Sequence, residues 1–365
     1  MKFSINWLLV FIPIALAVEH LQASPPVVFF CAALAIIPIA ALIVRSTGQL
    51  ATYTGDAVGG LLNATFGNAP ELIIALVALH AGQLEMVRAS IIGAILANLL
   101  LALGIAFLLG GLKHHDQTYN RVAARTYATM MLLAAMSLAI PSAFSRVLAP
   151  DETVRQEALL NVGVAAALLA IYVLYLVYSL KTHRGSFASE GADDGHGGHG
   201  GHGDDGPRWS LPRALASLVV ASLLAAWMSE VLVGAADGTG QALGMSSVFI
   251  GIVFLAVVGG AAESGSAIAM GAKNKLDLSI GIALGSSIQI ALFIAPVLVF
   301  ASYFIAPVPL ELSFSRAEVG TLFIGVFIGG MVFSDGQANW FKGVQLITIY
   351  LIIAMMFYFM PGVTT

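Results

Sequence analysis

The sequence has few charged residues and only one cysteine. Asp, Glu, Lys and Arg make up 10% of its 365 residues, whereas a soluble domain has about 25%. This scarcity excludes an ordinary soluble domain, and the formal net charge of −4 rests on too few groups to create a strong field. Cys31 lies in an apolar run and excludes a disulfide framework. We interpret it as a small buried apolar side chain.

Hydrophobic residues are abundant, at 59% of the chain. Apolar runs of roughly 20 residues, long enough to cross a bilayer, recur along almost the whole sequence. Because lipid offers no hydrogen-bond partners, such runs must satisfy their own backbone groups as helices. The composition therefore predicts an all-α polytopic membrane protein.

Eleven apolar segments can be marked as transmembrane helices. They lie near residues 6–20, 27–44, 57–80, 88–109, 125–141, 157–180, 213–234, 247–271, 278–303, 317–333 and 343–360. The first segment is also compatible with a secretory signal, because a lysine precedes a short apolar core. We favour a retained membrane helix, since another apolar segment follows at once.

One long connection, residues 181–212, divides the chain and contains SEGADDGHGGHGGHGDDG. Its Gly, Asp and His content without apolar periodicity is typical of a weakly structured linker. His196, His199 and His202 are spaced by paired glycines and leave two readings open, a regulatory metal site or a solvated linker, of which we favour the second. The expected organisation is a leading helix in 1–26, five helices in 27–180, this linker, and five helices in 213–365.

The basic residues indicate the orientation of the segments. With eleven spans, twelve of the 16 basic residues fall on the side of the N-terminus and four on the other. The first group is Lys2, Arg45, Lys113, Arg121, Arg125, Lys181, Arg184, Arg208, Arg213, Lys273, Lys275 and Lys342, and the second is Arg88, Arg146, Arg155 and Arg316. The bias predicts a cytoplasmic N-terminus and linker, with the C-terminus outside.

Two segments resemble each other. GNAPELIIALVALHAGQLEMVRASIIG (67–93) aligns without a gap with GGAAESGSAIAMGAKNKLDLSIGIALG (259–285). Glu71 then meets Glu263, and Glu85 meets Asp277. Because Glu71 is in the third span and Glu263 in the eighth, the two copies insert with opposite orientations. Such an inverted repeat is the signature of secondary transporters whose binding site lies near the membrane midplane.

Glu71 and Glu263 are costly in a membrane, on the order of 2.5–3.5 kcal/mol each at its centre. Hard divalent cations bind oxygen ligands, and Ca²⁺ takes six to eight of them. Breaks near Gly67 and Pro70, and near Gly259 and Gly260, free backbone carbonyl groups that could face an ion. Two such acids therefore predict a shared cation site. Bound cations and protons would occupy it alternately.

Other polar residues in the apolar segments are candidate ligands. Asn68 precedes Glu71 by three residues and shares its helical face. The remaining candidates lie in the spans that follow the two acids: Asn98, Ser286, Ser287 and Gln289. Each could instead make an ordinary hydrogen bond between helices. Glu230, Asp335 and Asn339 lie near span ends, on an ion path or simply at the surface.

These motifs resemble the calcium/proton antiporters of the cation/calcium exchanger superfamily. The resemblance rests on LLNATFGNAPELIIALVAL (61–79), ASIIGAILANLLLALG (89–104), VVGGAAES (257–264), KNKLDLSIGIALGSSIQIALF (273–293) and SDGQANWFKG (334–343). It implies a leading helix followed by two inverted five-helix repeats, with Glu71 and Glu263 as the essential acids. Asn68, Ser286 and Gln289 match further family positions. Gly260 and Ser264 depart from the asparagine and histidine that are common in the family.

The resulting expectation is a secondary antiporter, not an enzyme, that exports cytosolic Ca²⁺ in exchange for H⁺ through a cell's inner membrane. The alternative in the same superfamily is a Na⁺/Ca²⁺ exchanger, which is expected to carry hydroxyl-rich motifs around both acids. A membrane hydrolase is disfavoured because the spans lack HExxH and GxSxG motifs, and a channel because the repeat favours alternating access. No cofactor is expected. The expected partners are inorganic cations and the lipid bilayer, without nucleic acid, and homo-oligomerisation is left open.

Overall fold

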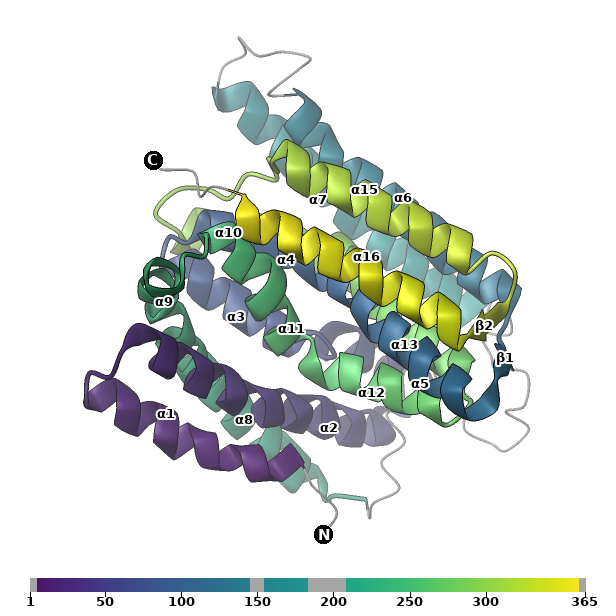
Figure 1. The fold of residues 1–365 in the computed structure, drawn as a ribbon, viewed down its shortest axis with the longest axis horizontal. Coiled ribbons are helices and arrows are strands. Elements are labelled where there is room, and N and C mark those ends of the chain that lie inside the picture. Colours follow the sequence, from purple (N-terminus) through teal and green to yellow (C-terminus); the bar gives the residue numbers. More distant parts are fainter. Residues whose placement is uncertain (1–4, 145–153, 183–207, 361–365) are drawn as a thin grey trace. The chain divides into compact units, whose positions relative to one another are not determined.

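The computed structural model describes residues 5–144, 154–182 and 208–360, and these are almost entirely helical (Figure 1). The chain divides into two compact units. Unit 1 comprises Met1–Gly93, His202–Ala262 and Ala354–Thr365, and unit 2 comprises Ala94–Gly201 and Glu263–Ile353. Each unit therefore combines segments from both halves of the sequence.

The elements of unit 1 include two long helices, α2 and α8. They are η1 (Ile5–Val10), α1 (Phe11–His20), α2 (Pro25–Phe66), α3 (Ala69–His80), most of α4 (Leu84–Leu96), α8 (Leu211–Gly234), α9 (Ala236–Leu243), α10 (Ser247–Phe249), η6 (Ile250–Leu255) and α11 (Ala256–Gly259). Unit 1 also contains the last turns of α16 (Trp340–Phe359).

Unit 2 contains the remaining helices and one short two-stranded sheet. Its elements are η2 (Ala97–Ala102), α5 (Leu103–His114), β1 (Asp116–Thr118), α6 (Arg121–Ala143), α7 (Val154–Val177), η4 (Tyr178–Thr182), most of α12 (Ala261–Ala272), α13 (Leu276–Gln289), η7 (Ile290–Ile294), α14 (Ala295–Ile305), α15 (Arg316–Val332), β2 (Gln337–Asn339) and most of α16. Strands β1 and β2 pair antiparallel, with Gln117 opposite Ala338.

The helices have the length and apolarity of a multi-pass membrane protein. Among the described residues, seven helices can cross a membrane, or eight if the bent pair Ser247–Gly259 and Ala261–Ala272 forms one span. Large apolar side chains are exposed along them, for example Leu223 of α8 and Leu174 of α7, at 66% and 61%. Such exposed apolar surface matches a lipid environment. The count of eleven spans stays a prediction.

The structure has no helix break between the predicted spans 27–44 and 57–80. Helix α2 runs without interruption from Pro25 to Phe66. The intervening sequence RSTGQLATYTGD contains no proline, and its serine and threonine hydroxyl groups bond to backbone carbonyl groups of the same helix. Ser46 donates to the carbonyl oxygen of Leu42 and Thr47 to that of Ile43. These polar side chains therefore do not compete with the helix, which ends only at Gly67.

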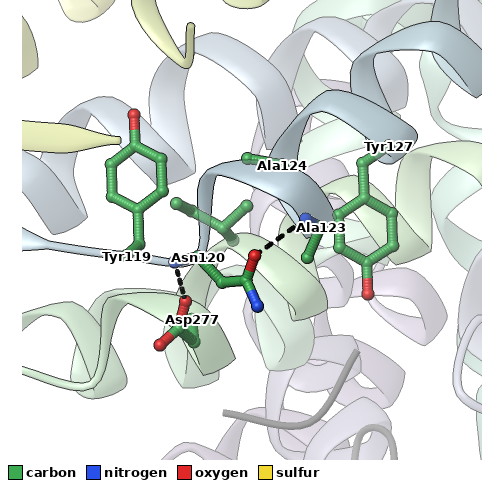
Figure 2. A pocket seen from close by; sticks show the side chains of 7 residues that line it. Tyr119, Asn120, Ala123, Ala124, Tyr127 and Asp277 are labelled. Atoms are coloured by element: carbon green, nitrogen blue, oxygen red, sulfur yellow. Dashed lines mark hydrogen bonds between the residues drawn. The ribbon is translucent and has the colours of Figure 1, made fainter. Parts of the chain in front are cut away.

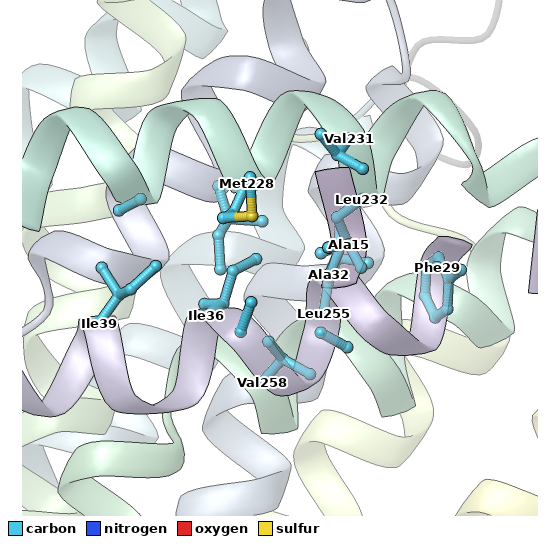
Figure 3. Packing of buried hydrophobic residues seen from close by; sticks show 14 of the residues in the cluster. Ala15, Phe29, Ala32, Ile36, Ile39, Met228, Val231, Leu232, Leu255 and Val258 are labelled. Atoms are coloured by element: carbon cyan, nitrogen blue, oxygen red, sulfur yellow. The ribbon is translucent and has the colours of Figure 1, made fainter. Parts of the chain in front are cut away.

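Unit 1 is held together by close packing around α2. Helix α2 packs against α1 and α8, and Figure 1 shows the three side by side. Phe29 and Ile36 of α2 are fully buried in the cluster of Figure 3, with Met228 and Leu232 of α8 and Val258 of α11. Burying each of these large side chains contributes about 1.5–3 kcal/mol relative to its exposed state in water. This gain is smaller when the exposed state is in lipid and not in water. Close packing between the side chains of neighbouring helices therefore contributes more to the stability of unit 1.

In unit 2, buried polar side chains support the extended segment between α14 and α15. Asn161 of α7 donates to the Leu310 carbonyl oxygen at 2.8 Å and accepts from the Leu312 N–H at 2.9 Å. Ser142 of α6 accepts from the Phe314 N–H at 2.7 Å. These bonds replace the helical partners that an extended backbone lacks. They fix a non-helical segment among helices.

The loop contacts within each unit join loops that the eleven-span prediction places on the same side. In unit 2, β1 and β2 join two predicted cytoplasmic loops, and Gln117 donates to the carbonyl oxygen of Gly271 and to Asn274 in a third. Ser142 and Leu312 join two predicted external loops. In unit 1, Gln83 donates to Asp237 at 2.6 Å between two further external loops. The contacts thus agree with the predicted sidedness.

Glycine is required where α4 crosses η6. A Cβ at Gly93 would lie 2.2 Å from the Ile252 carbonyl oxygen, and one at Gly251 would lie 2.6 Å from that of Met86. We predict that Gly251→Ala lowers stability by about 1–3 kcal/mol, because backbone would have to move. Gly48→Ala, with nothing within 4 Å of its Cβ, is the matched control and should be neutral or stabilising by up to about 1 kcal/mol. Thermal unfolding in detergent measures both, and equal midpoints would contradict the prediction.

Candidate functional site

Glu71 lies in the first turn of α3, directly after a break in the helical path. The break is at Gly67 and Asn68, where Asn68 has φ −92° and ψ 23°. Pro70 lies in the first turn, where its missing N–H costs no helical hydrogen bond. The carboxylate is therefore close to the positive end of the helix dipole, which favours a negative charge.

Glu263 has the same local setting in α12. Helix α11 ends at Gly259, and Gly260 has φ −78° and ψ 5° before α12 begins at Ala261. The two helices meet at a 63° bend. Gly260 aligns with Asn68, so both copies of the repeat break their helix at the same position and place a glutamate three residues later. The predicted breaks at Gly67 and Gly260 are present.

In unit 1, the Glu71 carboxylate is buried beside α11. Both of its oxygens are shielded from solvent. A Cβ at Gly259 would lie 3.0 Å from Glu71 Cγ, so glycine permits this close approach of the α11 backbone. Asn68 is also buried, with 2% of its surface exposed. Unit 1 therefore buries two predicted site residues that are three positions apart, at one helix break.

In unit 2, Glu263 belongs to a hydrogen-bonded network of small polar side chains. Ser264 donates to Asn98 Oδ1 at 3.1 Å, and Asn98 Nδ2 donates to Ser286 Oγ at 2.9 Å. Ser286 in turn hydrogen-bonds the Glu263 carboxylate. The other oxygen, Glu263 Oε2, is buried without a hydrogen-bond partner among the described residues. The network holds one carboxylate oxygen and leaves the other available to a ligand.

Ser287 and Gln289 are the remaining predicted ligands on α13. Ser287 is fully buried, but its hydroxyl donates to the Ala283 carbonyl oxygen of its own helix at 2.9 Å. Gln289 is partly buried at the end of α13. His196, His199 and His202 lie outside the described residues. Within the described part of the chain, no group of three or more His, Cys, Asp or Glu side chains is placed to hold a metal ion.

The spans that follow the two acids also share an irregularity. The π-helical segments η2 (Ala97–Ala102) and η7 (Ile290–Ile294) occur at aligned positions of the repeat. Such π-helical turns are rare and frequent at functional sites. Asn98 lies in η2, so the wide turn carries a member of the network. Sequence periodicity gave no sign of these turns, because they add one residue without changing the apolar pattern.

The pocket in Figure 2 lies in unit 2, at the start of α6 and α13, away from the predicted ligands in sequence. Asp277 accepts a hydrogen bond from the Asn120 N–H at 2.6 Å, and the Asn120 side chain caps α6. The enclosed space is about 20 Å³, enough for roughly one water. Asp277 therefore anchors a loop here, and the pocket is too small for a larger ligand.

The structure describes the surroundings of the weaker candidates at span ends. Glu230 is exposed, and Asn339 caps α16 by accepting from the N–H groups of Phe341 and Lys342. Partial desolvation would raise the pKa of Asp335, but hydrogen bonds from Lys342 and the Gln337 N–H outweigh it and lower that pKa. Asp335 is 54% exposed, so this ion pair contributes little to stability.

Ser264 is the site residue that sequence reasoning missed. It differs from the histidine common at this position in the family, and its polar role was therefore in doubt. Its hydroxyl group nevertheless donates to Asn98. The signal available in the sequence was its position beside Glu263, but a lone serine in a span is too common to be assigned on that basis.

We predict energetic coupling between Asn98 and Ser264. Asn98→Ala, Ser264→Ala and the double variant should give a coupling energy of about 0.5–1.5 kcal/mol, since one buried hydrogen bond joins them. Unfolding in mixed detergent micelles measures it. Ser287→Ala is the matched control, because Ser287 bonds only to its own helix in the bonds described, and its effect should add to that of Asn98→Ala. Additive effects for Asn98 and Ser264 would refute the network.

The chain is similar to known proteins over nearly its whole length. The family model described as "Sodium/calcium exchanger protein" matches residues 24–181 and 213–359. A Ca(2+)/H(+) antiporter of Aphanothece halophytica is 39% identical over 98% of this chain and 96% of its own length. The Ca(2+)/H(+) antiporter ChaA of Bacillus subtilis is 36% identical over 95% of this chain and 96% of its own.

A solved structure, that of native YfkE, has 32% identity and a TM-score of 0.82, and the match covers 98% of this chain and 100% of YfkE. The family match covers both halves of the sequence, on either side of the linker. The chain belongs to the sodium/calcium exchanger protein family.

Proposed function

We propose that this protein is a secondary antiporter that exchanges Ca²⁺ for H⁺ across a membrane. The observation that carries the proposal is the match, over nearly the full length of the chain, to Ca²⁺/H⁺ antiporters at 36–39% identity. Buried glutamates after two helix breaks supply chemistry that suits this exchange. The protein moves ions and is not expected to catalyse a chemical reaction.

The side chains around the two acids suit a hard divalent cation. Ca²⁺ prefers carboxylate, carbonyl and amide oxygens, with flexible geometry. Glu71 and Glu263 would neutralise its charge. Carbonyl groups at the two breaks, together with Asn68, Asn98 and Ser286, would complete the set of oxygen ligands. Ser287 and Gln289 remain candidates for outer positions, the former with its hydroxyl turned back to its own helix.

The two glutamates serve one site in this proposal. Support comes from the chain itself, because Gly259 lies against Glu71 within unit 1 and is only four residues before Glu263. The inverted repeat provides the second support. Asn68 and Gly260 have similar backbone angles, and both copies continue into a span with a π-helical turn. A site at the meeting point of two such repeats is typical of secondary transporters.

Proton coupling follows from the chemistry of two carboxylates in a site of low dielectric constant. Without a cation, two neighbouring negative charges repel, so the protonated, neutral forms are favoured. Cation-loaded and protonated states then exclude each other. If the repeats rearrange only when the site is neutralised, each Ca²⁺ that leaves is exchanged for protons that enter. The two helix breaks would act as hinges in this alternating access.

The orientation proposed is a cytoplasmic N-terminus in the inner membrane of the cell. The distribution of twelve basic residues against four supports it. Loop contacts within each unit, such as those of Gln117 with Gly271 and of Gln83 with Asp237, are consistent with the same sidedness. The eleven-span layout with two inverted five-helix repeats belongs to this proposal.

The test is ⁴⁵Ca²⁺ uptake into proteoliposomes driven by an imposed pH jump, without sodium. We predict uptake by the wild-type protein and a decrease of at least roughly 30-fold for Glu71→Gln or Glu263→Gln, because loss of one buried charged partner costs about 2–5 kcal/mol. Glu19→Gln is the control, since Glu19 is exposed at the end of α1, and it should transport normally.

Each outcome distinguishes a specific alternative. Uptake that requires a sodium gradient and ignores the pH gradient would identify a Na⁺/Ca²⁺ exchanger. Full exchange by both glutamine variants would refute the shared carboxylate site. Single-channel currents in planar bilayers would contradict alternating access.

A further inference from the structure

Three arginines gather around two aromatic rings in unit 1, where α2 meets the segment leading into α8. The Arg45 and Arg213 guanidinium carbons lie 4.9 Å and 4.8 Å from the centroid of the Trp209 ring. Arg208 lies 4.2 Å from the centroid of the Tyr53 ring. We call these five residues the arginine cluster. Trp209 itself is only 7% exposed, whereas the three arginines are exposed.

Hydrogen bonds fix the cluster to α2. The Trp209 N–H donates to Gln49 Oε1 at 2.9 Å, and the Tyr53 hydroxyl donates to the Trp209 carbonyl oxygen. Arg208 donates to Thr52 Oγ1 at 3.1 Å and to the Thr52 carbonyl oxygen at 2.6 Å. The rings and the backbone are therefore held in place, and the geometry of the arginines follows from that of the rings.

The cluster concentrates positive charge in a chain that has little of it. Arg208 and Arg213 make no ion pair with a carboxylate of the described residues. Stacking on an aromatic ring uses the face of a guanidinium group and leaves its N–H edges for an oxyanion. An anion bound beside Arg208 and Arg213 would offset their charges. A phosphate group, which accepts several such hydrogen bonds, fits this need.

The position of the cluster indicates where that phosphate comes from. Arg45 follows directly on the apolar segment 27–44, and Arg213 lies in the first turn of α8 (Leu211–Gly234). The apolar side chains of Leu215, Val219 and Val220 continue from there along α8, exposed at 48%, 56% and 53%. The cluster thus borders a lipid-facing surface, at the depth where tryptophan, tyrosine and lipid headgroups lie.

We propose that the arginine cluster binds the headgroup phosphate of an anionic phospholipid, in the leaflet on the side of the N-terminus. The lipid would offset positive charge in the cluster and link the middle of α2 to the start of α8. The source is a lipid and not a soluble phosphate, because the acyl chains would lie along the exposed apolar face of α8. This inference is independent of the transported ion.

The experiment uses the fluorescence of Trp209 as its probe. The variant Trp7→Phe, Trp227→Phe, Trp340→Phe leaves Trp209 as the single tryptophan of the four. It is reconstituted in phosphatidylcholine vesicles with a small fraction of either brominated phosphatidylglycerol or brominated phosphatidylcholine. We predict at least about twofold stronger quenching by the brominated anionic lipid, because the basic cluster enriches it locally. Equal quenching by both lipids would overturn the proposal.

Variants of the arginines identify the binding groups. Arg45→Gln, Arg208→Gln, Arg213→Gln together should abolish the preference for the anionic lipid, and the matching triple lysine variant, which keeps the charges, should retain part of it. Arg88→Gln, on the predicted opposite side, is the control and should leave the preference unchanged. Preference that survives removal of all three guanidinium groups would overturn the assignment.

A soluble-anion arm distinguishes the source of the phosphate. Glycerol 3-phosphate added at millimolar concentration should leave quenching by brominated phosphatidylglycerol unchanged, since it lacks the acyl chains. Displacement at that concentration would show a soluble phosphate site and would overturn the lipid assignment. The unaltered protein tests the proposal by a second measurement, because its thermal midpoint in detergent should rise with phosphatidylglycerol and not with phosphatidylcholine.

Discussion

An ionisable carboxyl group inside a membrane-spanning segment must be solvated by the protein, because lipid offers it nothing. The local structure around Glu71 and Glu263 follows from this constraint. Each acid is in the first turn of a helix, where the helix dipole favours negative charge. Each helix follows a break that frees backbone groups. Where the side-chain partners of an acid are described, as for Glu263, small hydroxyl and amide groups supply them.

The same constraint explains how irregular backbone is tolerated in the rest of the structure. The extended segment between α14 and α15 is held by Asn161 and Ser142, and the loop before α6 by Asp277. Buried polar side chains replace the backbone partners that a helix would have provided. Elsewhere, glycines allow the backbones of two helices to come close together, as at Gly93 and Gly251. Close approach matters because van der Waals packing, and not the hydrophobic effect, drives the association of helices in a membrane. A transporter of this kind combines rigid contacts with a few interrupted helices.

The proposed cation ligands and the proposed lipid site lie in different parts of unit 1. The Glu71 carboxylate and Asn68 are shielded from solvent, whereas the arginines of the arginine cluster are exposed. Helix α2 connects them, since it carries Arg45 in its middle and ends at the break before Glu71. An anionic lipid bound at the cluster would therefore act on the helix that leads to the first proposed ligand. Such a link would make transport sensitive to membrane composition through a packed helix.

The sequence by itself determined the membrane class, most of the long apolar helices, the corresponding positions of two acids and both helix breaks. Length, apolarity, glycine and proline act locally, so these features could be predicted without a structure. Tertiary structure decided what depends on contacts between distant segments. Helix α2 continues through a polar stretch because its hydroxyl groups bond to the backbone of the preceding turn. Ser264 bonds to Asn98, and Arg45 lies over the Trp209 ring, only because folding brings together residues that are more than 150 positions apart, and no local pattern encodes such pairs.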